Sequence, residues 1–95
     1  MNDAYARALL ESAASGNRHA MSGLYDLFAL DTYSVCAHYV QDDEGRADAM
    51  ARLWLHVWEI APRLASMGGS VRTALLSIAH SRASAGATRS PLALA

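Results

Sequence analysis

Apolar residues between positions 50 and 58 recur at a spacing that fits an α-helix with one buried side. They follow the order i, i+3, i+4, i+7, i+8, and are Met50, Leu53, Trp54, Val57 and Trp58. A strand would place odd and even positions on opposite faces, so these residues could not share one face of a sheet. The pattern therefore predicts a helix whose inner side, with both tryptophans, forms the centre of an apolar core.

The composition extends the helical prediction to the rest of the chain. Twenty of the 95 residues are alanine, the best helix former, whereas proline occurs twice and glycine six times. A chain of this length forms one domain at most, and its 53% of hydrophobic residues suffices for a core. We therefore expect an all-α fold, a compact bundle of about four helices, with one domain over residues 1–89 and a flexible tail over residues 90–95.

Turn residues divide the predicted helices from one another. The expected breaks are Ser15-Gly16-Asn17, an acidic turn over residues 41–45 and a loop over residues 63–69. Pro62 is expected to end or kink the third helix soon after Glu59, because proline lacks an N–H donor and its ring clashes with the preceding turn. Ser70 is expected to cap the fourth helix.

Charge is distributed unevenly along the chain, although the net charge is only −1. All nine acidic residues lie at or before Glu59, together with four of the eight basic residues, so this part carries −5. The remaining third has no acid and four arginines, which are Arg63, Arg72, Arg82 and Arg89. Such a basic stretch is a candidate contact for phosphate groups, and the alternative is a helix whose arginines are merely solvated.

The other reactive residue types form no pattern typical of an enzyme or a metal site. Cys36 is the single cysteine, and no two of the four histidines have the close helical spacing of a metal pair. Nucleophile elbows, phosphate loops and paired carboxylates are missing from the sequence, as are long uncharged apolar runs. We therefore expect a cytoplasmic protein that is not an enzyme, binds no metal or cofactor and does not contact a membrane.

A series of short motifs runs along most of the chain. In order, they are Leu24-Tyr25, Asp42-Asp43-Glu44, Leu55-His56-Val57-Trp58, and Gly69-Ser70 followed by Arg72-Thr73-Ala74-Leu75-Leu76-Ser77-Ile78-Ala79. The series resembles region 2 of the extracytoplasmic-function (ECF) sigma factors of the sigma-70 family, over about residues 3–89. The resemblance implies an all-helical domain that binds RNA polymerase core and promoter DNA.

The resemblance implies that the exposed side of the third helix docks on the clamp helices of the polymerase beta-prime subunit. The residues at the corresponding positions are Asp48, Ala51, Arg52, Leu55 and His56. Asp48 keeps the acid that is usual in the family, whereas Ala51 and Arg52 replace a Gln-Glu pair, so an acceptor is lost and a charge is reversed. An alternative for Arg52 is an ion pair with Asp48 at i, i+4.

The resemblance further implies that the loop after the third helix and the fourth helix bind the promoter minus-ten element. The residues expected to contact DNA are Arg63, Ser70, Arg72, His80, Arg82 and Arg89. The Trp, Asn and Asp that are usual in the fourth helix are replaced by Ala74, Ser81 and Ala85. DNA binding is therefore expected to be weak and to show little sequence preference.

These observations predict a sigma-factor-like transcription module that binds RNA polymerase core and the minus-ten element to support transcription initiation. The alternative is a degenerate sigma-like module that binds proteins, as an anti-sigma decoy or a sigma mimic, without promoter recognition. Region 2 normally accompanies a second domain, region 4, and no helix-turn-helix follows here. Three origins stay open: a fragment of a longer sigma factor, one half of a two-subunit factor, and a divergent protein. The further expected partners are thus an anti-sigma factor or a subunit that carries region 4.

Overall fold

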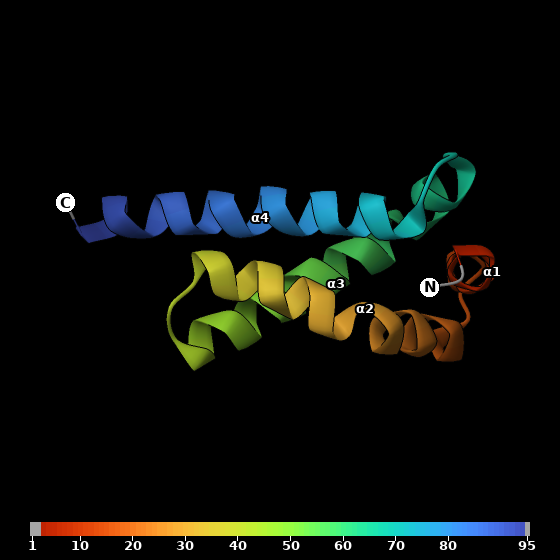
Figure 1. The fold of residues 1–95 in the computed structure, drawn as a ribbon, viewed down its shortest axis with the longest axis horizontal. Coiled ribbons are helices and arrows are strands. Elements are labelled where there is room, and N and C mark those ends of the chain that lie inside the picture. The colour runs from red at the N-terminus through yellow and green to blue at the C-terminus, as the bar shows by residue number, and fades with distance from the viewer. Residues whose placement is uncertain (1–2, 95) are drawn as a thin grey trace.

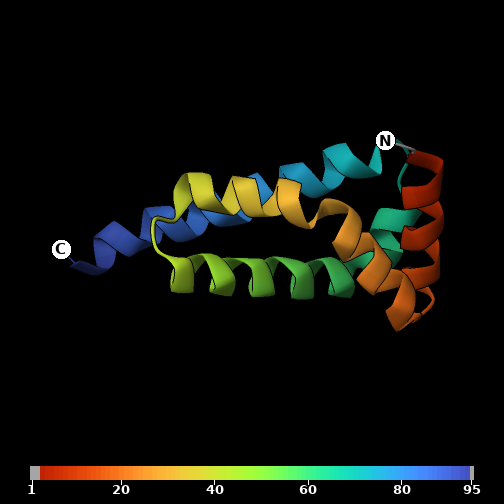
Figure 2. The same ribbon diagram turned by 60° about the horizontal axis from the view of Figure 1, so that its bottom comes forward.

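Four helices make up the computed structural model, which describes the backbone of residues 3–94 and the side chains of residues 3–85. They are α1 (Asp3–Ala14), α2 (Arg18–Tyr39), α3 (Asp43–Ser66) and α4 (Val71–Leu94). Helices α2 and α3 form an antiparallel hairpin, α1 crosses one end of this hairpin, and α4 lies along α2 in the same direction (Figure 1, Figure 2). Residues 3–94 contain no strand, so the prediction of an all-α bundle is confirmed.

Local signals set the first two turns, and the second is shorter than the predicted turn over residues 41–45, because α3 begins at Asp43. Gly16 adopts φ +97°, a left-handed conformation that glycine takes without strain, and the chain turns there after α1. Asn17 caps α2, because its side-chain oxygen accepts from the N–H of Ala20 at 3.2 Å. Asp42 caps α3 in the same way and accepts from the N–H of Gly45 at 2.9 Å. The N-terminus of α2 and the N-terminus of α3 are therefore each fixed by the residue that directly precedes the helix.

Helix α3 is longer than the sequence predicts and contains Pro62. Of the two outcomes expected at Pro62, an end of the helix is excluded, and the loop predicted from Arg63 is wrong, because α3 continues to Ser66. The proline removes one N–H donor, but Ala61 and Leu64, before and after it, are 0% and 7% exposed and hold this part of the helix against the core. Arg63 therefore lies on α3 and not in a loop.

Helix α4 also continues past its predicted end. Its backbone is helical through Ser90 and Pro91 to Leu94, where the sequence predicts a tail. A proline removes one N–H donor from a helix and crowds one preceding turn, so the other backbone hydrogen bonds of this long helix can persist. Arg89 therefore lies on α4, and its side chain is outside the described residues.

The core lies where the inner sides of the four helices meet. Its most deeply buried large side chains include Leu24, Phe28, Val57, Val71 and Leu75. Trp54 is also buried, at 8% exposure; its ring packs edge-on against Tyr25 with centroids 5.2 Å apart, and its Nε1 lies 3.4 Å from the Thr32 hydroxyl. The prediction that both indoles are buried holds for Trp54 alone, because Trp58 is half-buried at the edge of the inner side.

Candidate functional site

The outer side of α3 presents the residues that the sequence assigns to protein docking. The exposed ones are Asp48, Ala51, Arg52 and Leu55, and His56 is half-buried. Their spacing of i, i+3, i+4 and i+7 places the exposed four on one side of the helix, away from Leu53 and Val57 in the core. Leu55 is 61% exposed and lies beside the exposed Ala51. The fold thus brings the predicted docking residues together on one surface.

Arg52 and Asp48 form an ion pair on this surface. Arg52 Nε lies 3.0 Å from Asp48 Oδ2, and the two side chains are 70% and 61% exposed. An exposed i, i+4 pair of this kind contributes about 0.3–0.5 kcal/mol, so a binding partner can replace it at small cost. His56 adds a weak contact, with its Nδ1 4.0 Å from Oε1 of Glu59.

An apolar strip runs along the same side of α3 and shares Ala51 and Leu55 with the docking residues. The strip as a whole was not predicted from the sequence. It consists of Ala51, Leu55, Trp58 and Pro62, which follow i, i+4, i+7 and i+11 along α3. All are exposed except Trp58, which is half-buried. Tyr25 of α2, 40% exposed, packs against Trp54 one turn before Trp58. The helical spacing could have revealed the strip, but assigning both tryptophans to the core concealed it.

Two of the predicted DNA-binding arginines are exposed and unpaired. Arg63 on α3 and Arg82 on α4 have no hydrogen-bond or ion-pair partner for their guanidinium groups among the described side chains. Ser70 caps α4 as predicted, because its hydroxyl accepts from the backbone N–H three residues later at 3.2 Å. His80 is exposed, and its Nδ1 lies 3.1 Å from the hydroxyl of Tyr39. Arg63 and Arg82 are therefore, among the described residues predicted to contact DNA, the cations most available to an anionic ligand.

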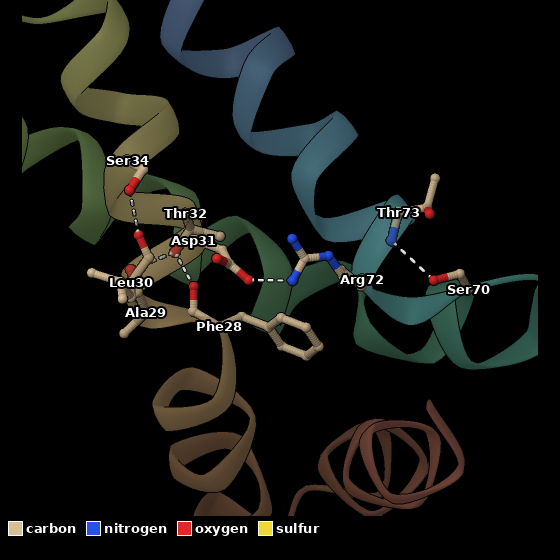
Figure 3. A network of polar contacts seen from close by, with 9 residues as sticks. All are labelled: Phe28, Ala29, Leu30, Asp31, Thr32, Ser34, Ser70, Arg72 and Thr73. Atoms are coloured by element: carbon tan, nitrogen blue, oxygen red, sulfur yellow. Dashed lines mark hydrogen bonds and ion pairs between the residues drawn. The ribbon is translucent and has the colours of Figure 1, made fainter. Parts of the chain in front are cut away.

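Arg72 is already engaged within the protein. Its guanidinium donates from α4 to the carboxylate of Asp31 on α2, as Figure 3 shows. The two side chains are 48% and 33% exposed, so the pair lies at the surface of the α2–α4 contact. A phosphate group can take Arg72 only in competition with Asp31. The two residues are 41 positions apart, and no spacing rule of a helix links them.

The described part of α4 offers little to a nucleotide base. Ala74 is half-buried, and Ser81 and Ala85 are exposed. Between Val71 and Ala85 the helix has no phenylalanine, tyrosine or tryptophan on which a base could stack. Recognition by this part of α4 would rest on charge more than on contacts with base edges.

Cys36 is buried, and burial raises the pKa of its thiol, so the group stays protonated and unreactive. Among the described side chains, no three or more of the types His, Cys, Asp and Glu gather closely enough to hold a metal ion. None of the described helices combines the length and the apolar character that crossing a membrane requires.

Comparison with known proteins identifies no relative of the chain. No protein-family model, curated protein or solved structure matches it. Its function is therefore argued from the exposed surfaces of α3 and α4 together with the motif resemblance.

Proposed function

We propose that this chain is a sigma-like transcription module that binds RNA polymerase core through α3 and promoter minus-ten DNA through α4 and the end of α3. The observation that carries the proposal is the division of the motif residues between core and surface. Val57, Leu75 and Ala79 are buried, whereas the described side chains assigned to polymerase or DNA are exposed, apart from the half-buried His56. A module of this kind acts in the cytoplasm, where polymerase and promoter DNA are found.

The α3 surface has the chemistry that a partner helix needs. The apolar strip, which includes Leu55, supplies apolar contacts at helical spacing, and the charged side chains of Asp48 and Arg52 lie beside it. Burying the exposed part of Leu55 would contribute roughly 1–2 kcal/mol, more than the Asp48–Arg52 pair contributes. Apolar contact therefore provides most of the affinity, and the charges select the partner and its orientation.

The proposed DNA contact is electrostatic. The guanidinium groups of Arg63 and Arg82 have no partner among the described side chains, and Arg72 becomes a third contact once Asp31 is displaced. Each phosphate contact with a single strand makes the logarithm of the binding constant fall with the logarithm of salt concentration by about 0.7. Two or three contacts give slopes of about −1.4 to −2.1, so binding is weak without polymerase.

A second candidate function is protein binding without DNA. The Arg72–Asp31 pair favours it, because one of the expected phosphate-binding cations is occupied. The lack of large aromatic side chains between Val71 and Ala85 favours it as well. In this case the α3 surface would bind an anti-sigma factor as a decoy, or would occupy a sigma-binding surface on polymerase.

Titrating the full chain with two ligands separates these functions. The ligands are the isolated clamp-helix fragment of the beta-prime subunit and a fluorescein-labelled, AT-rich single strand at low salt. Binding of both supports the sigma-like function, and binding of the protein fragment alone supports the second candidate. Binding of neither overturns the proposed function.

Matched variants assign each ligand to its surface. Leu55→Asp should weaken binding of the clamp-helix fragment about tenfold or more and leave DNA binding unchanged. Arg63→Ala combined with Arg82→Ala should reduce the salt slope by about 1.4 and leave fragment binding unchanged. Arg18→Ala is the control for loss of a positive charge, because Arg18 is exposed on α2 and its guanidinium has no partner among the described residues.

A further inference from the structure

Two charged side chains of α1 hold the connection between α3 and α4, residues 67–70. The guanidinium of Arg7 donates to three backbone carbonyl oxygens, at 3.3, 3.0 and 2.8 Å, which belong to Ala65, Met67 and Gly69. The carboxylate of Asp3 accepts from the N–H of Val71 at 3.0 Å. Both ends of the connection are thereby bonded to α1, which crosses this end of the bundle (Figure 2).

The connection has little packing of its own. A Cβ added at Gly68 or Gly69 would meet nothing within 4 Å, and Met67 is 53% exposed. Gly69 also adopts φ +93°, a conformation that glycine takes without strain. Adjacent glycines without packing leave a segment free to sample many conformations. The contacts from α1 therefore restrain residues 67–70 in addition to the bonds of Met67 and Ser70 with the adjoining helices.

Arg7 and Asp3 also match the electrostatics of the helix ends that they contact. Arg7 lies at the C-terminal end of α3, where unpaired carbonyl groups carry partial negative charge. Asp3 lies at the N-terminal end of α4, where unpaired N–H groups carry partial positive charge. Because Arg7 donates only to carbonyls of the protein, its guanidinium is committed to the fold, in contrast to that of Arg63.

We propose that Arg7 and Asp3 are positioning residues, which fix residues 67–70 in the shape that meets a nucleic-acid strand. The inference rests on the proposed function, in which Arg63 and the first turn of α4 contact DNA. The connection joins these two elements, so its shape sets the direction from one phosphate contact to the next. Loosening it lowers affinity because binding must then order the segment, although no phosphate contact is lost.

Amide hydrogen exchange, followed by NMR on the full chain, tests the hold itself. The reporters are the N–H of Met67, which bonds to the carbonyl of Leu64, and the N–H of Val71. We expect Arg7→Ala to speed exchange at both positions about tenfold or more, because charged hydrogen bonds that restrain the segment are lost. Arg18→Ala should leave both rates unchanged. Equal rates in Arg7→Ala and the unmodified chain would overturn the inference.

Arg7→Lys separates this specific hold from general loss of structure. Lysine keeps the positive charge and the helix propensity but lacks the planar fork that reaches several carbonyls at once. Its circular dichroism and thermal midpoint should match those of the unmodified chain, while exchange at Met67 still rises. Full protection of Met67 in Arg7→Lys would show that charge alone is sufficient, and the proposed hold by the guanidinium would be wrong.

DNA titration at several salt concentrations tests the functional part. Arg7→Ala should lower affinity for the single strand about three- to tenfold with an unchanged salt slope, whereas Arg63→Ala should reduce the slope by about 0.7. A reduced slope in Arg7→Ala would mean that Arg7 itself contacts phosphate, which overturns the positioning role. If the unmodified chain binds no DNA, the proposed function fails and the promoter role of α1 fails with it. The exchange rates still decide whether α1 holds the connection.

Discussion

Arg72 and Asp31 form an ion pair that joins α4 to α2 and that also places a carboxylate on a cation which a phosphate would otherwise contact (Figure 3). The side chains are 48% and 33% exposed, so the pair contributes about 1 kcal/mol or less to the stability of the fold. Competition for Arg72 can alter DNA binding by a comparable or larger amount, because each phosphate contact also releases counterions. Under the proposed function, the pair therefore matters at least as much for DNA binding as for folding.

Replacing Asp31 by Asn should strengthen DNA binding more than it weakens the fold. The amide keeps the size of the side chain but removes its charge, so Arg72 becomes available to phosphate. We expect the salt slope of single-strand binding to steepen by about 0.7, and the free energy of unfolding to fall by no more than about 1 kcal/mol. Fluorescence anisotropy and urea unfolding measure the two quantities.

Asp26→Asn is the matched control for this change. Asp26 is exposed on the same helix and has no partner for its carboxylate among the described residues. It should alter DNA binding only slightly, through the net charge. Equal effects of Asp26→Asn and Asp31→Asn would contradict the competition between Asp31 and phosphate.

The two tryptophans of α3 should contribute unequally to stability. Trp54 is 8% exposed and contacts both Tyr25 and Thr32, whereas Trp58 is half-buried. We expect Trp54→Ala to lower the free energy of unfolding by about 3–5 kcal/mol and Trp58→Ala by about half as much. Urea unfolding followed by circular dichroism measures both losses. A larger loss for Trp58→Ala than for Trp54→Ala would be inconsistent with the observed burial.

Gly45 should resist a substitution that normally stabilises a helix. Alanine is preferred over glycine inside a helix by about 0.5–1 kcal/mol. At Gly45, however, a Cβ would lie 2.7 Å from Cγ1 of Val40 and 2.8 Å from Oδ1 of Asp42, the residue that caps α3. Displacing this cap costs about 1 kcal/mol, so Gly45→Ala should lower the thermal midpoint. Gly68→Ala, where a Cβ would meet nothing, should not lower it, and a gain in stability at Gly45 would contradict the close approach.

Sequence signals predicted those parts of the fold that depend on near neighbours along the chain. The turn at Gly16 and the cap at Ser70 each depend on residues within the next few positions. The rule applied to Pro62 is also local, and it failed because it takes no account of the core. Burial of Leu64 beyond the proline keeps α3 helical despite the missing donor.

No pattern in the sequence indicated which residues far apart along the chain contact each other. Arg7 bonds a carbonyl 60 positions away, and Arg72 bonds a carboxylate 41 positions away. Charge counting assigned Arg7 to the acidic part of the chain and Arg72 to the basic part, without separating paired arginines from unpaired ones. That distinction comes from the contacts of α1 and α2 with α3 and α4. Among the described side chains these contacts leave the guanidinium groups of Arg63 and Arg82 without a partner.

Arg52 provides the most direct test of the docking surface, because the family that the chain resembles has an acid at this position and therefore a basic partner. Arg52→Glu replaces the 3.0 Å ion pair with Asp48 by two acids at i, i+4, and the lost attraction and the new repulsion together cost the free chain about 0.5–1 kcal/mol. Against a basic partner, reversing the charge removes a repulsion, and binding of the clamp-helix fragment should strengthen about tenfold. Arg18→Glu makes the same charge change away from α3 and should leave that binding unchanged. Unchanged or weaker binding of Arg52→Glu, measured by titration with the isolated fragment, would show that this surface serves a partner other than the polymerase clamp helices.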